Sequence, residues 1–260
     1  MSLYVESSGA GPPLVLLHGW AMHSGLWLPV LPTLESRFRV HRVDLPGHGF
    51  SAAISPYTLA GMVDAVSGTL ALAPLPEAAT IVGWSLGGAV ALEWARARAD
   101  EIARLVLIGT TPSFVARDGW PHAMSRETLA RFGDELDLSY RATLQRFVIL
   151  QVRGSEHERE VLAQLRSQLF ARGEPTREAL AATLALLAAT DLREDIGDVE
   201  QPALVVSGGR DALAPPAAGA WLAAALPQGR HALIDGAAHA PFLSHAEAFL
   251  AALTAFCDGR

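Results

Sequence analysis

A serine in this chain lies where nucleophilic catalysis requires one. Ser85 is the central residue of a G-x-S-x-G sequence over residues 83–87. An apolar, β-branched run of strand type precedes it over residues 79–82, and a stretch rich in Ala, Leu, Arg and Glu, typical of a helix, follows it. A serine on a sharp turn between strand and helix is a nucleophile elbow, in which glycines avoid steric clashes and the helix N-terminus favours an oxyanion. A glycine-rich turn without a catalytic role is the alternative, and the flanking elements argue against it.

A serine hydroxyl needs an adjacent base, and that base needs an acid to orient it. Asp211 follows an apolar run over residues 203–206, and His239 follows another over residues 231–234. Ligands of open α/β sheets bind beyond the carboxyl ends of the strands, so we expect these side chains to meet there. The chain order Ser, Asp, His is one of the orders known for such triads. We therefore predict Ser85 as the nucleophile, His239 as the base and Asp211 as the orienting acid.

Other acidic and basic residues compete for these roles. Asp44 lies in a turn-rich loop after the apolar residues 40–43, but it precedes Ser85 in the chain, so we interpret it as a residue that braces its loop. The remaining candidates do not follow the end of a predicted strand: Asp191, Asp195, His231 and His245.

The elements that must position these residues alternate between strands and helices. The strands are predicted over residues 14–17, 40–43, 79–82, 105–108, 203–206 and 231–234, and the helices over residues 59–72, 89–98, 215–226 and 246–256. This alternation predicts the α/β class, with a mostly parallel sheet flanked by helices. Residues 112–191 contain no convincing strand and predict several helices, as in a lid inserted over an active site. We predict a core of residues 1–111 and 192–260 and a helical lid of residues 112–191.

Backbone N–H groups near Ser85 are candidates for an oxyanion hole. The apolar residues 14–17 end at His18-Gly19-Trp20, where the glycine allows the backbone to approach a ligand closely. In the fold that the elbow indicates, one N–H comes from this loop and the other from the residue after the nucleophile. We predict these donors to be Trp20 and Leu86. For the Trp20 side chain, packing in the core is the alternative.

Composition argues against several classes of protein. The formal net charge of −7 disfavours general nucleic-acid binding. The single cysteine, Cys257, allows no internal disulfide, and no Cys and His cluster suggests a metal. The first eleven residues do not resemble a signal peptide, and the longest Ala and Leu run, over residues 179–189, is too short to span a bilayer. We expect a monomer of the cytoplasm that needs no metal, membrane or nucleic acid.

Four segments of the chain resemble one family of hydrolases. They are residues 83–88, 111–121, 146–151 and 237–242, of which the second contains F-x-A-R-D-x-W-P, a far more specific sequence than G-x-S-x-G. The sheet portions resemble the α/β-hydrolase superfamily, and these segments resemble its pimeloyl-[acyl-carrier protein] methyl ester carboxylesterases, which serve biotin biosynthesis. The resemblance implies hydrolysis of a methyl ester at the far end of a pimeloyl chain held as a thioester on acyl carrier protein. It implies no cofactor.

The same resemblance implies contacts to the acyl chain from one helix of the lid. By their spacing, Phe147, Leu150 and Gln151 lie on one side of that helix. Packing of the lid on the sheet is the alternative role for Phe147 and Leu150. The matching segment comprises Phe147, Val148, Ile149, Leu150 and Gln151.

Arginines of the lid are candidates for contact with the acidic carrier protein. Between residues 138 and 155 the chain has Arg141, Arg146 and Arg153 and no acidic residue. Arg146 and Arg153 are seven residues apart, which predicts a shared helix face turned away from the acyl chain. Arg159 could extend this patch from the next helix, together with Arg166. The resemblance supports Arg146 and Arg159 most directly, and ordinary solvated charges are the alternative.

Two other functions remain open at this point. A general short-chain carboxylesterase or a C–C bond hydrolase of the same fold would use the same three catalytic residues. A hydrolase fold retained as a non-catalytic receptor is the other alternative, and an intact triad argues against it.

Overall fold

Seven strands form one sheet in the computed structural model, which describes residues 2–71 and 77–259. The strand order is β1-β3-β2-β4-β5-β6-β7, and all neighbouring pairs are parallel except β1 and β3. The strands are β1 Val5–Ser8, β2 Pro13–Leu17, β3 Arg39–Val43, β4 Ala79–Trp84, β5 Ile102–Ile108, β6 Ala203–Gly208 and β7 Gly229–Ile234. The α/β class and the six predicted strands are confirmed, whereas β1 was not predicted.

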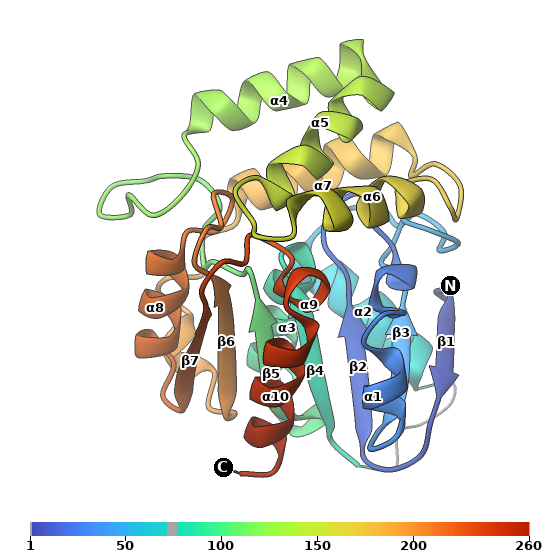
Figure 1. Cartoon of the computed structure of the whole chain (residues 1–260), viewed down its shortest axis with the longest axis vertical. Coiled ribbons are helices and arrows are strands. Elements are labelled where there is room, and N and C mark those ends of the chain that lie inside the picture. The colour runs from blue at the N-terminus through green and yellow to red at the C-terminus, as the bar shows by residue number, and fades with distance from the viewer. Residues whose placement is uncertain (1, 72–76, 260) are drawn as a thin grey trace.

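Helices cover both faces of this sheet, which explains why its inner strands are continuous apolar runs. Strands β2, β4 and β6 are buried along their whole length. Helices α1 and α10 lie in front of the sheet in Figure 1, and α2 and α3 lie behind it. The helices outside the insertion are α1 Leu31–Glu35, α2 Leu59–Leu70, α3 Leu86–Ala97, α8 Pro216–Ala225, α9 Pro241–Ser244 and α10 Ala246–Cys257. Leu72, the last residue of one predicted helix, lies outside the described residues.

Four helices lie between β5 and β6 and form a layer at the top of the sheet (Figure 1). They are α4 Arg126–Leu138, α5 Tyr140–Val152, α6 Glu158–Gln168 and α7 Arg177–Ala189. Residues 112–191, called the insertion below, contain only isolated β-bridges besides these helices. The division of the chain at residues 111 and 191 stays a prediction. None of the helices in the described part of the chain has both the length and the apolarity to cross a bilayer.

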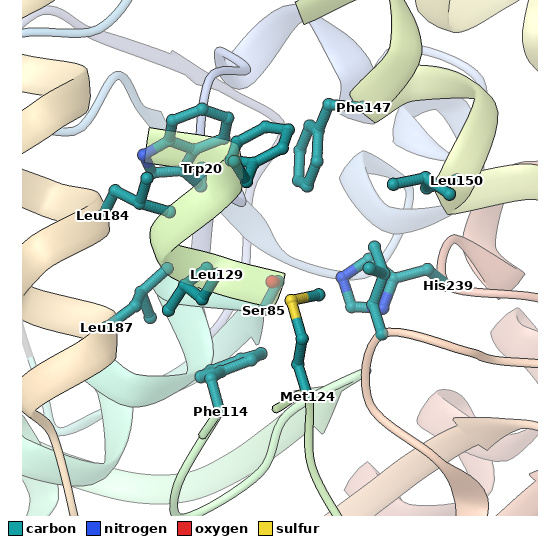
Figure 2. A pocket seen from close by; sticks show the side chains of 12 residues that line it. Trp20, Ser85, Phe114, Met124, Leu129, Phe147, Leu150, Leu184, Leu187 and His239 are labelled. Carbon is teal, nitrogen blue, oxygen red and sulfur yellow. The ribbon is translucent and has the colours of Figure 1, made fainter. Parts of the chain in front are cut away.

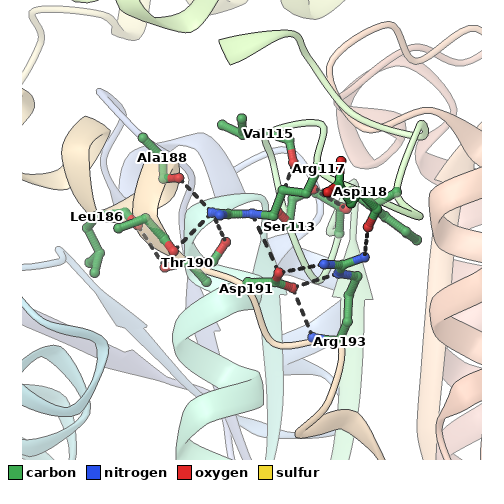
Figure 3. A network of polar contacts seen from close by, with 12 residues as sticks. Ser113, Val115, Arg117, Asp118, Leu186, Ala188, Thr190, Asp191 and Arg193 are labelled. Carbon is green, nitrogen blue, oxygen red and sulfur yellow. Dashed lines mark hydrogen bonds and ion pairs between the residues drawn. The ribbon is translucent and has the colours of Figure 1, made fainter.

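Arg117 joins the two ends of the insertion (Figure 3). Its guanidinium donates to the carbonyls of Ala188, Ala189 and Thr190 at 2.8, 3.0 and 3.3 Å, and so satisfies carbonyls that the end of α7 leaves without helical partners. Its Nε lies 3.5 Å from a carboxylate oxygen of Asp191. The entry and the exit of the insertion are therefore held side by side.

Arg172 ties the other side of the insertion to the sheet. It lies in the connection between α6 and α7, and its guanidinium pairs with Asp44 at 3.2 Å and with Glu6 of β1. The rings of Tyr4 and Phe50 lie 5.1 and 5.4 Å from its guanidinium carbon, within the range of cation–π contacts. The Asp44 side chain has no exposed surface, so an arginine of the insertion neutralises a carboxylate buried in the core.

Candidate active site

Ser85 occupies a strained turn between β4 and α3. Its backbone has φ 55° and ψ −113°, a conformation rare for residues other than glycine. The turn brings the chain close to β2: a Cβ on Gly87 would lie 2.4 Å from the carbonyl oxygen of Leu17. The N–H of Ser85 donates to the carbonyl of Ile108 at 2.9 Å, which fixes the turn on β5. Such strain at a serine is typical of a nucleophile elbow, as the sequence predicts.

Asp211 and His239 form a buried pair beyond the ends of β6 and β7. The Nδ1–H of His239 donates to Oδ2 of Asp211 at 2.8 Å, and the two residues are 2% and 4% exposed. The other oxygen of Asp211 accepts the N–H groups of Leu213 and Ala214 at 2.8 and 2.9 Å. The carboxylate is thus fixed before any ligand arrives, and it holds the imidazole in the tautomer that leaves Nε2 free to accept a proton.

Backbone contacts hold the His239 loop against the core and the insertion. The His239 N–H donates to the carbonyl of Gln151, in the last turn of α5, at 3.0 Å. The indole N–H of Trp84 donates to the carbonyl of His239 at 2.8 Å. The insertion is therefore part of the structure that positions the imidazole.

A pocket lies between the sheet and the insertion, with Ser85 and His239 on its wall (Figure 2). Its other lining residues are apolar: Trp20, Phe114, Met124, Leu129, Phe132, Phe147, Leu150, Leu184, Leu187 and Leu213. Of the predicted segment 147–151, only Phe147 and Leu150 line this pocket. Val148 and Gln151 are fully buried elsewhere, and Ile149 is partly buried.

Several lining residues were missed by the sequence reasoning. Phe114 and Met124 come from the segment that leads into α4, while Leu129 and Phe132 lie on α4 and Leu184 and Leu187 on α7. Each helical pair has the i, i+3 spacing of an apolar face, which marks residues that pack inwards. Spacing alone does not show that this face meets the nucleophile.

The predicted oxyanion donors come from two elements near Ser85, which shares its pocket with Trp20. Leu86 is the first residue of α3, and Trp20 follows the end of β2. Within the described part of the chain, neither backbone N–H has a hydrogen-bond acceptor. Two unpaired donors near a strained serine suit the developing charge of a tetrahedral intermediate.

The competing acids and bases lie outside this pocket. Asp44 braces its loop, as expected, because its carboxylate accepts the N–H groups of Ser24 and Phe50 at 2.7 and 3.0 Å. Burial acts to raise its pKa, but His18 and these N–H groups hold the pKa of the Asp44 carboxyl below its usual value. Asp191 pairs with Arg193, and His231 contacts the Ser207 hydroxyl at 3.0 Å.

No group of His, Cys, Asp and Glu in the described residues suits a metal ion.

The arginines of the insertion differ in their surroundings. Arg146 pairs with Glu135 at 2.8 Å, and Arg141 pairs with Glu174. Helix α5 ends at Val152, and Arg153 is the residue that caps it, with its N–H still bonded to the carbonyl of Ile149. The shared helix face of Arg146 and Arg153 stays a prediction. Six exposed arginines of the insertion have no ion pair to another described residue: Arg126, Arg131, Arg153, Arg159, Arg166 and Arg177. Of these, Arg153 lies just before α6, and Arg159 and Arg166 lie on it.

Comparison with known proteins agrees with this geometry. Residues 12–246 match the family described as the alpha/beta hydrolase fold. The chain is 42% identical over 254 residues to the pimeloyl-[acyl-carrier protein] methyl ester esterase of Nitrosomonas europaea, covering 98% of this chain and 99% of that protein. It is 44% identical over 255 residues to the esterase of the same name from Xanthomonas campestris, covering 98% of each.

A solved structure has the same fold over almost the whole chain. The enol-lactonase of Burkholderia xenovorans is 28% identical, with a TM-score of 0.86 over 98% of this chain and 96% of that one. The chain therefore belongs to the α/β-hydrolase family and, within it, to the family of pimeloyl-[acyl-carrier protein] methyl ester esterases.

Proposed function

We propose that this chain hydrolyses the methyl ester of pimeloyl-[acyl-carrier protein] methyl ester, releasing methanol and pimeloyl-[acyl-carrier protein]. Its similarity to esterases of that name extends over nearly their full length. The observation that carries the proposal is the pocket, in which Ser85 and His239 are the polar residues on an otherwise apolar wall. A methylene chain that ends in an uncharged ester suits such a wall, whereas a free carboxylate would be buried without a partner.

The first half of the reaction forms an acyl-enzyme. The Ser85 hydroxyl attacks the ester carbonyl while Nε2 of His239 takes its proton. Asp211 holds the imidazole by its Nδ1–H and stabilises the imidazolium that forms. The N–H groups of Trp20 and Leu86 stabilise the oxyanion, and His239 returns the proton to the departing methanol.

The second half repeats these steps with water. His239 takes a proton from water, the hydroxide attacks the acyl-enzyme, and the proton passes back to Ser85 as the acid leaves. The product carries a carboxylate among apolar side chains, and its desolvation favours release.

Two measurements test this function. The first is methanol release from methyl pimeloyl-[acyl-carrier protein] by the purified enzyme, with Ser85→Ala as the inactive control. The second is growth without biotin of a strain that lacks its own methyl esterase and expresses this chain. Hydrolysis of p-nitrophenyl acetate without either result would favour a general esterase. Failure of all three assays would favour a non-catalytic role.

The carrier protein binds, in this proposal, to the exposed side of α6 and the connection that precedes it. Arg153, Arg159 and Arg166 lie there without ion pairs to other described residues, among the acidic residues Glu156, Glu158 and Glu160. Glu156 pairs with Arg210, and Glu158 accepts the N–H of Gly154, so these two carboxylates already have partners. Rim charges act mainly on the encounter rate and its salt dependence. Arg153→Glu with Arg159→Glu should therefore raise KM for the carrier-linked ester and flatten its dependence on salt, with no change for p-nitrophenyl acetate.

A matched control comes from the opposite end of the sheet. Arg39→Glu also reverses an exposed charge, at the start of β3, and should leave both substrates unaffected. An equal loss with both substrates for Arg153→Glu with Arg159→Glu would show that these arginines stabilise the insertion and that the carrier binds elsewhere.

A further inference from the structure

Trp20 lies in the loop after β2, and its side chain contacts the insertion. Its indole N–H donates to the carbonyl of Leu180, on α7, at 3.1 Å. Its ring packs edge-to-face against Phe147 of α5 and Phe132 of α4, with centroids 4.9 and 5.6 Å apart. The residue is 2% exposed. Three helices of the insertion therefore contact one side chain of the core.

The loop that carries Trp20 holds a strained turn. The N–H of Met22 donates to the carbonyl of Gly19 at 3.3 Å, and Ala21 between them has φ 62°. A left-handed conformation is strained for alanine, so neighbouring structure must hold it in place.

Contacts on two sides hold this turn. On the core side, the ring of His18 donates from Nδ1 to the carbonyl of Gly19 at 2.8 Å and accepts the N–H of Leu45 at 2.9 Å. On the insertion side, the directional contact is the indole bond from Trp20 to Leu180. Trp20 lies inside the turn, so its backbone N–H depends on both anchors.

We propose that Trp20 is a positioning residue whose indole bond to α7 sets the oxyanion-hole N–H of the same residue. The proposal rests on the function proposed above, which gives that N–H to the oxyanion. When α7 is seated on the core, the indole bond is formed and the donor is in place. When α7 lifts, the turn loses its anchor on the insertion side. Seating of the insertion and stabilisation of the transition state are thereby coupled through one residue.

Trp20→Phe tests the coupling because it keeps an aromatic wall and removes the indole donor. Removal of one oxyanion donor lowers kcat by about 10²–10³-fold, and a misplaced donor should lose part of that. We expect kcat for p-nitrophenyl acetate to fall roughly tenfold, with KM changed less than threefold. Affinity for a trifluoromethyl ketone, which forms a tetrahedral adduct with the serine, should fall by the same factor as kcat.

Trp120→Phe is the matched control. Trp120 is likewise a buried tryptophan, but it lies in the insertion. Its indole donates to the carbonyl of Ser113 at 2.9 Å, and it does not line the pocket. It should lower Tm by an amount similar to Trp20→Phe and leave kcat and ketone affinity within twofold. Should Trp20→Phe fail to fold, replacement of Trp20 by 3-benzothienylalanine keeps the ring shape and exchanges the N–H for sulfur.

The outcomes separate this proposal from the proposed mechanism. If Ser85→Ala is inactive and Trp20→Phe keeps wild-type kcat and ketone affinity, the coupling is refuted and the mechanism stands. If Trp120→Phe loses as much kcat as Trp20→Phe, the effect is general loosening of the insertion and the coupling is also refuted. If Ser85→Ala retains activity, the mechanism itself is wrong.

Discussion

Arg172→Met removes the cation that the insertion places against a buried carboxylate. Methionine keeps an unbranched apolar stem beside Tyr4 and Phe50 while the charge is lost. Removal of one partner of a buried ion pair costs about 3–5 kcal/mol. Asp44 keeps its bonds from the N–H groups of Ser24 and Phe50, so we expect the lower end of that range, about 3 kcal/mol.

Urea denaturation at pH 7 measures this loss directly. A chain of this size shifts its Tm by roughly 2–4 °C per kcal/mol, so calorimetry should show a fall of roughly 6–12 °C. KM for the carrier-linked ester should rise because the connection between α6 and α7 loses its anchor, whereas the triad is untouched. Arg172→Lys keeps the charge but not the two-pronged geometry, and it should lose less stability than Arg172→Met.

The double variant Arg172→Met with Asp44→Asn decides whether the buried charge is the cause. The double variant has no carboxylate to leave unpaired. Its loss of unfolding free energy should therefore be at least about 1 kcal/mol smaller than the sum of the two single losses. If the two losses simply add, or if Arg172→Met costs less than 1 kcal/mol, the reasoning about a neutralised core carboxylate is refuted.

Three further predictions concern catalysis and pH. Ser85→Ala should lower kcat by roughly a millionfold while circular dichroism stays unchanged, and a residual rate above a few per cent would show another nucleophile. Asp211→Asn should lower kcat on the order of 10⁴-fold because an amide favours the wrong tautomer of His239; Asp44→Asn should affect stability and leave kcat nearly intact, and the reverse ranking would exchange the two roles. Burial lowers the pKa of His18 to about 3, with His48 adding to the effect, and burial lowers the pKa of His48 to about 4. Histidines of the unfolded chain take up protons near pH 6.5, whereas these two stay neutral in the folded protein, so the free energy of unfolding should decrease as the pH falls below 6.5. The decrease should be about 2 kcal/mol at pH 5 for each of the two residues. Equal urea midpoints at pH 7 and pH 5 would contradict this.

The sequence predicted the inner strands well because burial on both faces requires continuous apolar runs. Strand β1 escaped prediction for the opposite reason. Its sequence, Val5 to Ser8, contains one apolar residue, and it is fixed by antiparallel pairing with β3 rather than by burial of its side chains. Pairing with the backbone of another strand leaves no mark on the residue types of β1 itself.

The residues of the candidate site likewise fall into those that the sequence predicted and those that it did not. Chain order and strand ends were enough to predict Ser85, Asp211 and His239, because parallel strands bring their carboxyl ends to one edge. Arg172 gave no local signal, since its partners Asp44 and Glu6 lie more than a hundred residues away in the chain. The face that Leu184 presents to the pocket likewise depends on how α7 rests on the core.

The contacts of Arg117 have a consequence for how such enzymes can diverge. They fasten the start of the insertion to the end of α7, while Arg193 links Asp191 to the carbonyl of Asp118 at the same place. The closure of a long loop costs little more than that of a shorter one, so a replacement of different length can be accommodated between fixed ends. The insertion is thus closed at its base, but Arg172 and the Gln151 carbonyl also hold it on the core. A chimaera that takes the acyl preference of a relative must therefore retain these two contacts as well as the junction residues if the catalytic base is to keep its place.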